Sequence, residues 1–181
     1  MQWFALPLLF VSGSLAQLTG WGDCPTVTSM TDFVPASYMG LWYESYRTVA
    51  IFEAGAVCVT ATYTLNDNGT VTVENSAKSV LLGSSSITGL ATIVGDSDNG
   101  ILSVKFSSLP FVASYQVLDT DYTNWASVFS CTKFGLFNLQ FYWVLTRAQS
   151  PLTSILDEAF AVYTTNGLKT KYLAQTNQTG C

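Results

Sequence analysis

The chain has 181 residues, 49% of them hydrophobic and 10% charged, and its 12 Asp and Glu against 7 Lys and Arg give a net charge of −5. This length predicts one domain, and seven scattered cations argue against a binding surface for nucleic acid. Because the chain contains no His, it cannot build a Ser-His-Asp or Cys-His site and lacks the commonest metal ligand, so we expect neither an enzyme nor a metal site.

The chain opens with an apolar segment, residues 1–16, which ends in Ser14-Leu15-Ala16. Small residues at 14 and 16 fit a signal-peptidase site, although no Lys or Arg precedes the apolar run. We therefore expect residues 1–16 to be a signal peptide, against the alternative of a short buried segment, and residues 17–181 to be a single secreted domain. No later apolar run is long enough to span a bilayer, so no membrane span is expected.

Cysteines and sequons also fit a secreted protein. An even number of cysteines behind a signal peptide predicts two disulfides, and the spacing leaves three pairings open. The chain has no Cys-x-x-Cys motif of the kind that binds zinc. Asn68 and Asn177 each begin an Asn-x-Thr sequon, which predicts an exposed position and N-glycosylation, or an unused sequon. The four cysteines are Cys24, Cys58, Cys131 and Cys181.

The body of the chain predicts strands. Residues 17–39, rich in Gly, Pro, Thr and Ser, indicate an extended arm before the first strand. Eight runs of alternating or β-branched residues then follow, and Asn-Gly signals within 66–69 and 98–100 indicate tight turns. The expected strands are residues 40–50, 57–65, 70–77, 86–94, 101–106, 112–118, 125–131 and 138–147.

A helix is predicted after the last strand. Ser150-Pro151 fits a start with Ser as N-cap and Pro in the first turn, and Asn166-Gly167 fits the end. One helix after eight strands predicts an all-β fold, an eight-stranded antiparallel up-and-down β-barrel with the C-terminal α-helix packed outside. The apolar stripe expected to pack on the sheet is Leu152, Ile155, Leu156, Ala159, Phe160 and Tyr163.

A barrel of eight strands leaves room for one small ligand. The inward face predicted from strand alternation is mainly apolar and aromatic, and Asn75 stands out on it as a polar residue. Such a group needs a partner, which is either backbone or water, or the polar end of a ligand. The predicted inward residues are Tyr63, Val71, Val73, Asn75, Phe106, Phe141 and Trp143.

Three separated motifs carry a family resemblance. The run from Gly40 to Glu44 (GLWYE), the run from Thr120 to Tyr122 (TDY) and Arg147 at the end of the last strand resemble the three signatures of the lipocalins, in the same order and at similar spacing. The resemblance covers the chain from about Cys24 to Cys181. Within the family the chain is most similar to the apolipoprotein D-like branch, which includes bilin-binding insect proteins and crustacyanins.

The resemblance implies structural roles for these motifs. It implies that Trp42 plugs the closed end of the barrel and that Arg147 covers it by a cation–π contact. Gly40, Thr120, Asp121 and Tyr122 would complete this end, so none of them is expected to be catalytic. The branch pattern also implies the pairings Cys24–Cys131 and Cys58–Cys181.

The same resemblance places the open end at residues 50–56, 78–85 and 107–112. Phe52, Leu109 and Phe111 in these segments indicate a lid over the ligand, a contact with a membrane, a lipoprotein or another subunit, or side chains folded into the mouth.

The leading functional hypothesis is a secreted carrier that holds a small hydrophobic molecule without covalent attachment and requires no cofactor. The candidates are a carotenoid, a bilin such as biliverdin, a retinoid, a steroid or a fatty acid, and the pigment-binding relatives favour the first two. Because Arg47 and Lys78 are the cations expected near the mouth, a neutral ligand or a carotenoid fits better than an acid. The expected ligand-binding residues are Tyr46, Tyr63, Val73, Asn75, Phe106, Tyr115, Phe141 and Trp143.

Two other hypotheses belong to different classes. A carotenoprotein subunit would give colour through homo- or hetero-oligomeric assembly, with exposed apolar loops as contacts. An enzyme would need a free Cys thiol of the kind that some lipocalins use for isomerisation, and here all four cysteines are expected to be paired.

Overall fold

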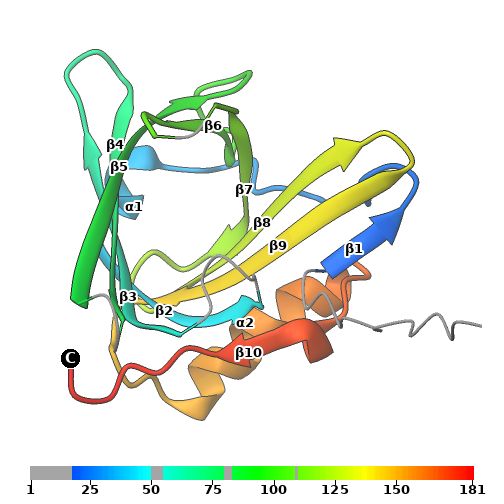
Figure 1. The fold of residues 1–181 in the computed structure, drawn as a ribbon. Coiled ribbons are helices and arrows are strands. Elements are labelled where there is room, and N and C mark those ends of the chain that lie inside the picture. The colour runs from blue at the N-terminus through cyan, green and yellow to red at the C-terminus, as the bar shows by residue number, and fades with distance from the viewer. Residues whose placement is uncertain (1–17, 50–54, 80–82, 109) are drawn as a thin grey trace, which may run out of the picture.

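The computed structural model describes residues 18–49, 55–79, 83–108 and 110–181, and its backbone forms a closed barrel. Each strand from β2 to β9 pairs antiparallel with the next, and β9 also pairs with β2, so the predicted eight-stranded barrel is confirmed (Figure 1). The barrel strands are β2 (Gly40–Thr48), β3 (Ala56–Leu65), β4 (Val71–Ser79), β5 (Gly83–Ile93), β6 (Ile101–Phe106), β7 (Ala113–Thr120), β8 (Trp125–Phe134) and β9 (Phe137–Thr146).

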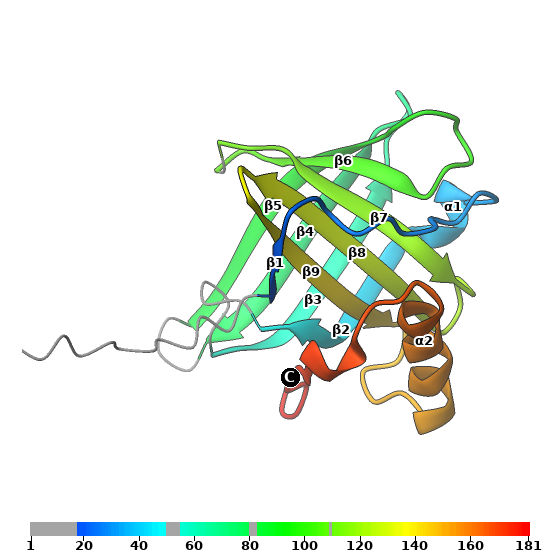
Figure 2. The same ribbon diagram turned by 90° about the vertical axis from the view of Figure 1, so that its right-hand side faces the viewer.

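Two short strands add to the sheet at β9 and β2. Strand β1 (Leu18–Trp21) pairs with β9, and β10 (Leu173–Gln175) pairs with β2 after the short 3₁₀ helix η2 (Thr170–Tyr172). The predicted arm crosses the outside of the barrel and reaches the one-turn helix α1 (Pro35–Tyr38) (Figure 2). Segments of three or four residues are too short to show a periodicity, so the sequence did not predict them.

The C-terminal helix α2 (Thr153–Thr165) packs on the outside of the barrel, as predicted (Figure 2). Its predicted start at Ser150-Pro151 is wrong, because Leu152 is the N-cap with an extended ψ of 150° and its carbonyl accepts the first helical N–H groups. Leu152 itself is 73% exposed and lies off the packed stripe. The predicted end is confirmed, with Asn166 as C-cap and Gly167 at a φ of +70°.

Tyr163 anchors the helix to the barrel. Its ring stacks on Tyr142 at 5.5 Å between centroids, and its buried hydroxyl donates to the Trp143 carbonyl at 2.6 Å and accepts the Val128 N–H at 3.0 Å. The core is therefore divided between the barrel interior and a second cluster under α2.

In the described residues no helix is long and apolar enough to cross a membrane.

Two disulfides tie the N-terminal arm and the C-terminal tail to the barrel. Cys24 pairs with Cys131 of β8, and Cys58 of β3 pairs with Cys181. These are the pairings that the resemblance implied, and together they use all four cysteines of the chain.

Candidate functional site

One end of the barrel is sealed by Trp42, which is completely buried. The Arg147 guanidinium lies 3.7 Å above the centre of the Trp42 ring, so the expected cation–π contact is present. The indole N–H donates to the Tyr38 carbonyl at 2.8 Å, and Gly40 takes a φ of +93° that other residues rarely adopt. Arg147 also donates to the carbonyl oxygens of Leu41, Met39 and Tyr122.

The loop beside this seal is built by Thr120 and Asp121. The Asp121 carboxylate accepts the N–H groups of Asn124 and Trp125 at 2.7 and 3.0 Å. Burial acts to raise the pKa of this carboxyl, but these hydrogen bonds outweigh it and lower the pKa. The Thr120 hydroxyl accepts the Tyr122 N–H and donates to the Trp125 carbonyl. These side chains fix a turn, and none of them forms a nucleophile–base pair.

Inside the barrel three tyrosine hydroxyls form a chain. The Tyr115 hydroxyl lies 2.8 Å from that of Tyr38 and 2.8 Å from that of Tyr63, which brings together β7, α1 and β3. Tyr38 and Tyr63 are buried and Tyr115 is partly exposed. Three hydroxyls have three protons and the chain uses two of them, so one O–H can still donate to another acceptor.

Burial raises the pKa of each of these hydroxyls, that of Tyr63 to about 12. An unfolded tyrosine ionises near its ordinary value of 10.0, so the unfolded chain releases this proton first as the pH rises. We therefore expect the contribution of Tyr63 to stability to be complete below pH 10.0 and to be lost as the pH rises to about 12. Urea unfolding across this pH range checks this, and Tyr63→Phe should show a shallower loss; an identical loss in the variant would contradict the assignment.

Asn75 lies on the same interior wall, on β4 opposite Ala61 of β3 and Ile87 of β5. Its Oδ1 atom is buried and has no hydrogen-bond partner among the described residues. A buried acceptor without a partner is costly, so this position favours a molecule that brings a donor. On the inner face of β4, the residue next to Asn75 is Val73, which pairs with Tyr63 of β3. The chain of tyrosine hydroxyls therefore lies close to Asn75 along the same wall.

The rest of the predicted lining is aromatic. Phe106 and Trp143 pack against the interior cluster while remaining partly exposed, whereas Val73 is buried. The rings of Phe141 and Trp143 stack at 5.8 Å on the inner face of β9. Partly exposed aromatic rings on an inward face are an apolar surface on which a hydrophobic ligand can pack.

Tyr46, expected among the ligand-binding residues, lies outside the barrel instead. Strict alternation from Trp42 and Glu44 would turn Tyr46 inward, but β2 has a bulge between Glu44 and Tyr46 that shifts the pairing register with β9. The Tyr46 ring consequently makes an edge-to-face contact with Phe160 of α2 at 5.0 Å. Its position is that of a packing residue under the helix.

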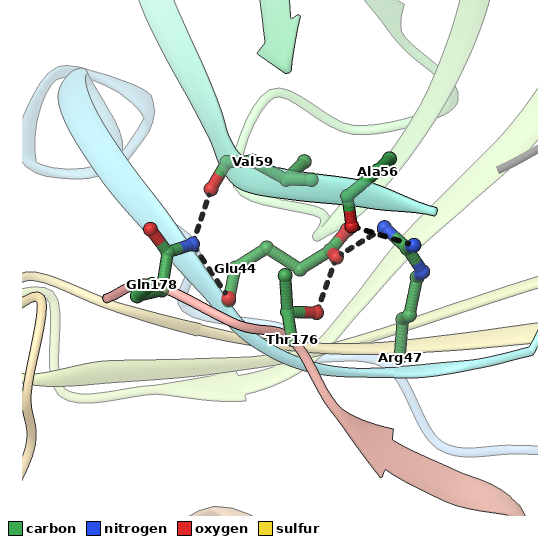
Figure 3. Close-up of polar contacts among 6 residues, drawn as sticks. All are labelled: Glu44, Arg47, Ala56, Val59, Thr176 and Gln178. Atoms are coloured by element: carbon green, nitrogen blue, oxygen red, sulfur yellow. Dashed lines mark hydrogen bonds and ion pairs between the residues drawn. The ribbon is translucent and has the colours of Figure 1, made fainter. Parts of the chain in front are cut away.

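The bulge also creates a charged pair that alternation did not predict (Figure 3). The Arg47 guanidinium lies 2.7 Å from the Glu44 carboxylate, and both side chains are largely buried. The same carboxylate oxygen accepts the Thr176 hydroxyl at 2.6 Å. Arg47 is therefore neutralised inside the protein, while Lys78 is exposed and reaches the Cys181 carbonyl at 3.5 Å.

Several predicted positions at the open end can be located. Phe111 and Val112 are 57% and 53% exposed, whereas Phe52 and Leu109 lie outside the described residues. A second exposed apolar group, not predicted, lies where β1 meets the β8–β9 hairpin, with Trp21 and Phe137 rings 4.7 Å apart. The described residues contain no cluster of three or more potential metal ligands.

The chain is similar to known proteins both in sequence and in fold. Apolipoprotein D of Mus musculus is 34% identical over 161 residues, which cover 88% of this chain and 85% of the relative. The Lazarillo protein of Schistocerca americana is 35% identical over 158 residues, or 84% and 72% of the two chains. Insecticyanin from Manduca sexta shares the fold with a TM-score of 0.77 and 20% identity over 89% of each chain. Apocrustacyanin C2 does so with a TM-score of 0.76 and 20% identity over 90% and 92%.

The family model for the lipocalin-like domain matches residues 35–178, from α1 to the tail beyond β10. The match includes the Trp42–Arg147 seal, the barrel and the outer helix. The chain therefore belongs to the lipocalin family, and it is similar to the apolipoprotein D-like proteins within it.

Proposed function

We propose that this lipocalin is a secreted carrier that holds one small hydrophobic molecule inside its barrel, with residues 1–16 as the signal peptide of a 17–181 domain. The observation that carries the proposal is the interior wall itself. Partly exposed aromatic rings share this wall with the Asn75 Oδ1 atom, which has no hydrogen-bond partner in the described part of the chain. They also share it with the chain of tyrosine hydroxyls, which has one proton left to donate. Apolar contact supplies affinity, at roughly 25 cal/mol per Å² buried, and the polar atoms orient the ligand.

The polar groups favour a neutral ligand with a hydroxyl or carbonyl group. Asn75 Oδ1 calls for a donor, and the tyrosine chain accepts or donates as the ligand requires. Arg47 is already paired with Glu44, so it is a poor anchor for a carboxylate. These contacts support a hydroxylated carotenoid, a retinoid or a steroid over a fatty acid or a bilin bound through its propionates.

A binding titration tests the proposal. Retinol and a hydroxylated steroid, as neutral probes, and a fatty acid would be titrated while fluorescence is followed, with Trp143 as an interior reporter. We expect Asn75→Leu and Tyr115→Phe each to weaken binding of the better neutral probe by about 5- to 150-fold, because each removes a buried hydrogen bond worth about 1–3 kcal/mol.

Glu74→Gln is the matched control, since Glu74 is exposed on the outer face of β4 between Val73 and Asn75. It should leave the affinity unchanged. Equal affinity in all three variants, or tighter binding of the fatty acid than of either neutral probe, would contradict the proposed contacts. Absorption and mass spectra of protein purified from its source would identify the natural ligand.

A second candidate function is a pigment-protein subunit that acts through assembly. It is favoured by the exposed apolar group of β1 and the β8–β9 hairpin. Another subunit would cover this surface. A concentration-dependent sedimentation coefficient together with a shifted visible absorption band would support this function, and a colourless monomer would refute it. The exposed residues are Trp21, Phe134, Leu136 and Phe137.

A further inference from the structure

The two Asn-x-Thr sequons are held in very different ways. Asn68 and Asn177 are both exposed, as the acceptor asparagine of N-glycosylation must be. Asn68 lies in the turn between β3 and β4, and Asn177 lies in the tail that follows β10. The two sequons differ in whether their hydrogen-bond partners lie within the same turn or on other strands of the barrel.

The first sequon interacts within its own hairpin. Asn68 Oδ1 accepts the N–H and the hydroxyl of Thr70 at 3.1 and 2.7 Å, and Asn66 donates to the Thr70 hydroxyl at 2.9 Å. A Cβ added to Gly69 would meet no atom within 4 Å, so the space on the side where a side chain would project is open. The hairpin projects from the barrel in Figure 1. Among the described residues, the hydrogen-bond partners of the side chains in this sequon therefore all lie within the β3–β4 turn.

The second sequon is fixed to two barrel strands. Gln178, its middle residue, donates its side-chain N–H groups to the Val59 carbonyl at 2.7 Å and the Glu44 carbonyl at 3.0 Å, so it bridges β3 and β2 (Figure 3). The Asn177 carbonyl accepts the Cys58 N–H at 2.9 Å. Gln149 donates to the Gln178 carbonyl at 2.9 Å.

Contacts on both sides hold the tail in this position. Before the sequon, Thr176 donates its N–H to the Ser45 carbonyl and its hydroxyl to Glu44, and after it Cys181 is bonded to Cys58. A transferase must take the asparagine and its two following residues as a detached stretch of chain. The docked tail cannot supply that stretch without breaking the bridge from Gln178.

The order of synthesis strengthens the contrast. When Asn68 emerges, β4 to β9 have not been made, and the barrel cannot close because β9 pairs with β2. When Asn177 emerges, all eight barrel strands precede it, and the tail can dock on β2 and β3 at once. Asn68 is thus accessible during synthesis, and Asn177 competes with docking.

We propose that Asn68 carries an N-linked glycan and that docking of the C-terminal tail keeps Asn177 largely unmodified. In the transfer, the Asn68 side-chain nitrogen attacks the anomeric carbon of a lipid-diphosphate-linked oligosaccharide. The bond from that carbon to the diphosphate oxygen breaks, the lipid diphosphate leaves with the electron pair, and the nitrogen gives up one proton to a base. The glycan lies at the sealed end of the barrel, because the β3–β4 turn follows the pairing of Tyr63 with Gly40.

The full chain secreted from a eukaryotic host tests the proposal. Peptide N-glycosidase treatment in heavy-oxygen water converts each glycosylated Asn to labelled Asp, and peptide mass spectrometry then reports the occupancy of each site. We expect most Asn68 to be labelled and most Asn177 to be unlabelled. Asn68→Gln should abolish the main glycan and leave the binding of a neutral probe such as retinol unchanged.

Variants of the tail separate docking from the sequon itself. Gln178→Ala keeps a valid sequon and the disulfide but removes the bridge between β2 and β3, and Cys181→Ser releases the end of the tail. Both should move Asn177 from a minority to a majority of glycosylated chains, whereas Gln175→Ala, at an exposed side chain of β10, should not. Secreted protein without glycan at Asn68, full occupancy of Asn177 in the unaltered chain, or no response to Gln178→Ala would each overturn the proposal, and none of these results bears on ligand binding.

Discussion

Trp42→Ala is expected to lower the free energy of unfolding by about 3–5 kcal/mol, the usual cost of truncating a buried aromatic side chain. The ring is completely buried, with the Arg147 guanidinium 3.7 Å from its centre and the Tyr38 ring at 5.1 Å. Its loss would leave a cavity at the sealed end, remove the cation–π contact and delete the donor to the Tyr38 carbonyl. Denaturant unfolding analysed by linear extrapolation measures the change.

Trp21→Ala is the matched control for this variant. Trp21 is also an indole on a strand of the same sheet, but it is 72% exposed, so we expect its truncation to change stability by no more than about 0.5 kcal/mol. If Trp42→Ala were as stable as the unaltered chain and had lost only ligand affinity, Trp42 would be part of the binding site and not the seal of the barrel.

The barrel was predictable because its physics is local and periodic. Alternation of side chains places strands to within a few residues, as at Ile101–Phe106, where the predicted and observed bounds coincide. The two disulfides were a different kind of prediction, because cysteine spacing left three pairings open and the family resemblance chose between them. The seal of Trp42 by Arg147 likewise came from the resemblance, since the two residues are far apart in sequence.

The interior site was less predictable, because it depends on local departures from periodicity. A single bulge after Glu44 turns Tyr46 out of the barrel and brings Arg47 to Glu44, and alternation alone cannot detect such a bulge. Tyr38 enters the hydroxyl chain from a one-turn helix within a segment expected to be extended. Its available signal was Pro35, which is favoured in the first turn of a helix.

The pair formed by this bulge also connects the barrel interior with the C-terminal tail. Glu44 of β2 is 4% exposed, and its carboxylate accepts hydrogen bonds from Arg47 of the same strand and from Thr176 of the tail (Figure 3). A buried carboxylate is tolerated because a cation and a hydroxyl surround it. The same cation would otherwise be available to an acidic ligand, so the internal pair is also the reason why we propose a neutral ligand.

Arg47→Met is therefore expected to lower the free energy of unfolding by about 3–5 kcal/mol, because it removes the guanidinium beside a buried carboxylate while keeping much of the side-chain volume. The double variant Glu44→Gln with Arg47→Met should recover most of this loss, since a neutral amide can still accept the Thr176 hydroxyl. Lys133→Met is the control, because it breaks an exposed ion pair with Asp23 and should cost at most about 1 kcal/mol. Urea unfolding of the four proteins measures these differences. A double variant no more stable than Arg47→Met would show that Arg47 acts by packing and by its bond to the Ala56 carbonyl, and not by neutralising Glu44.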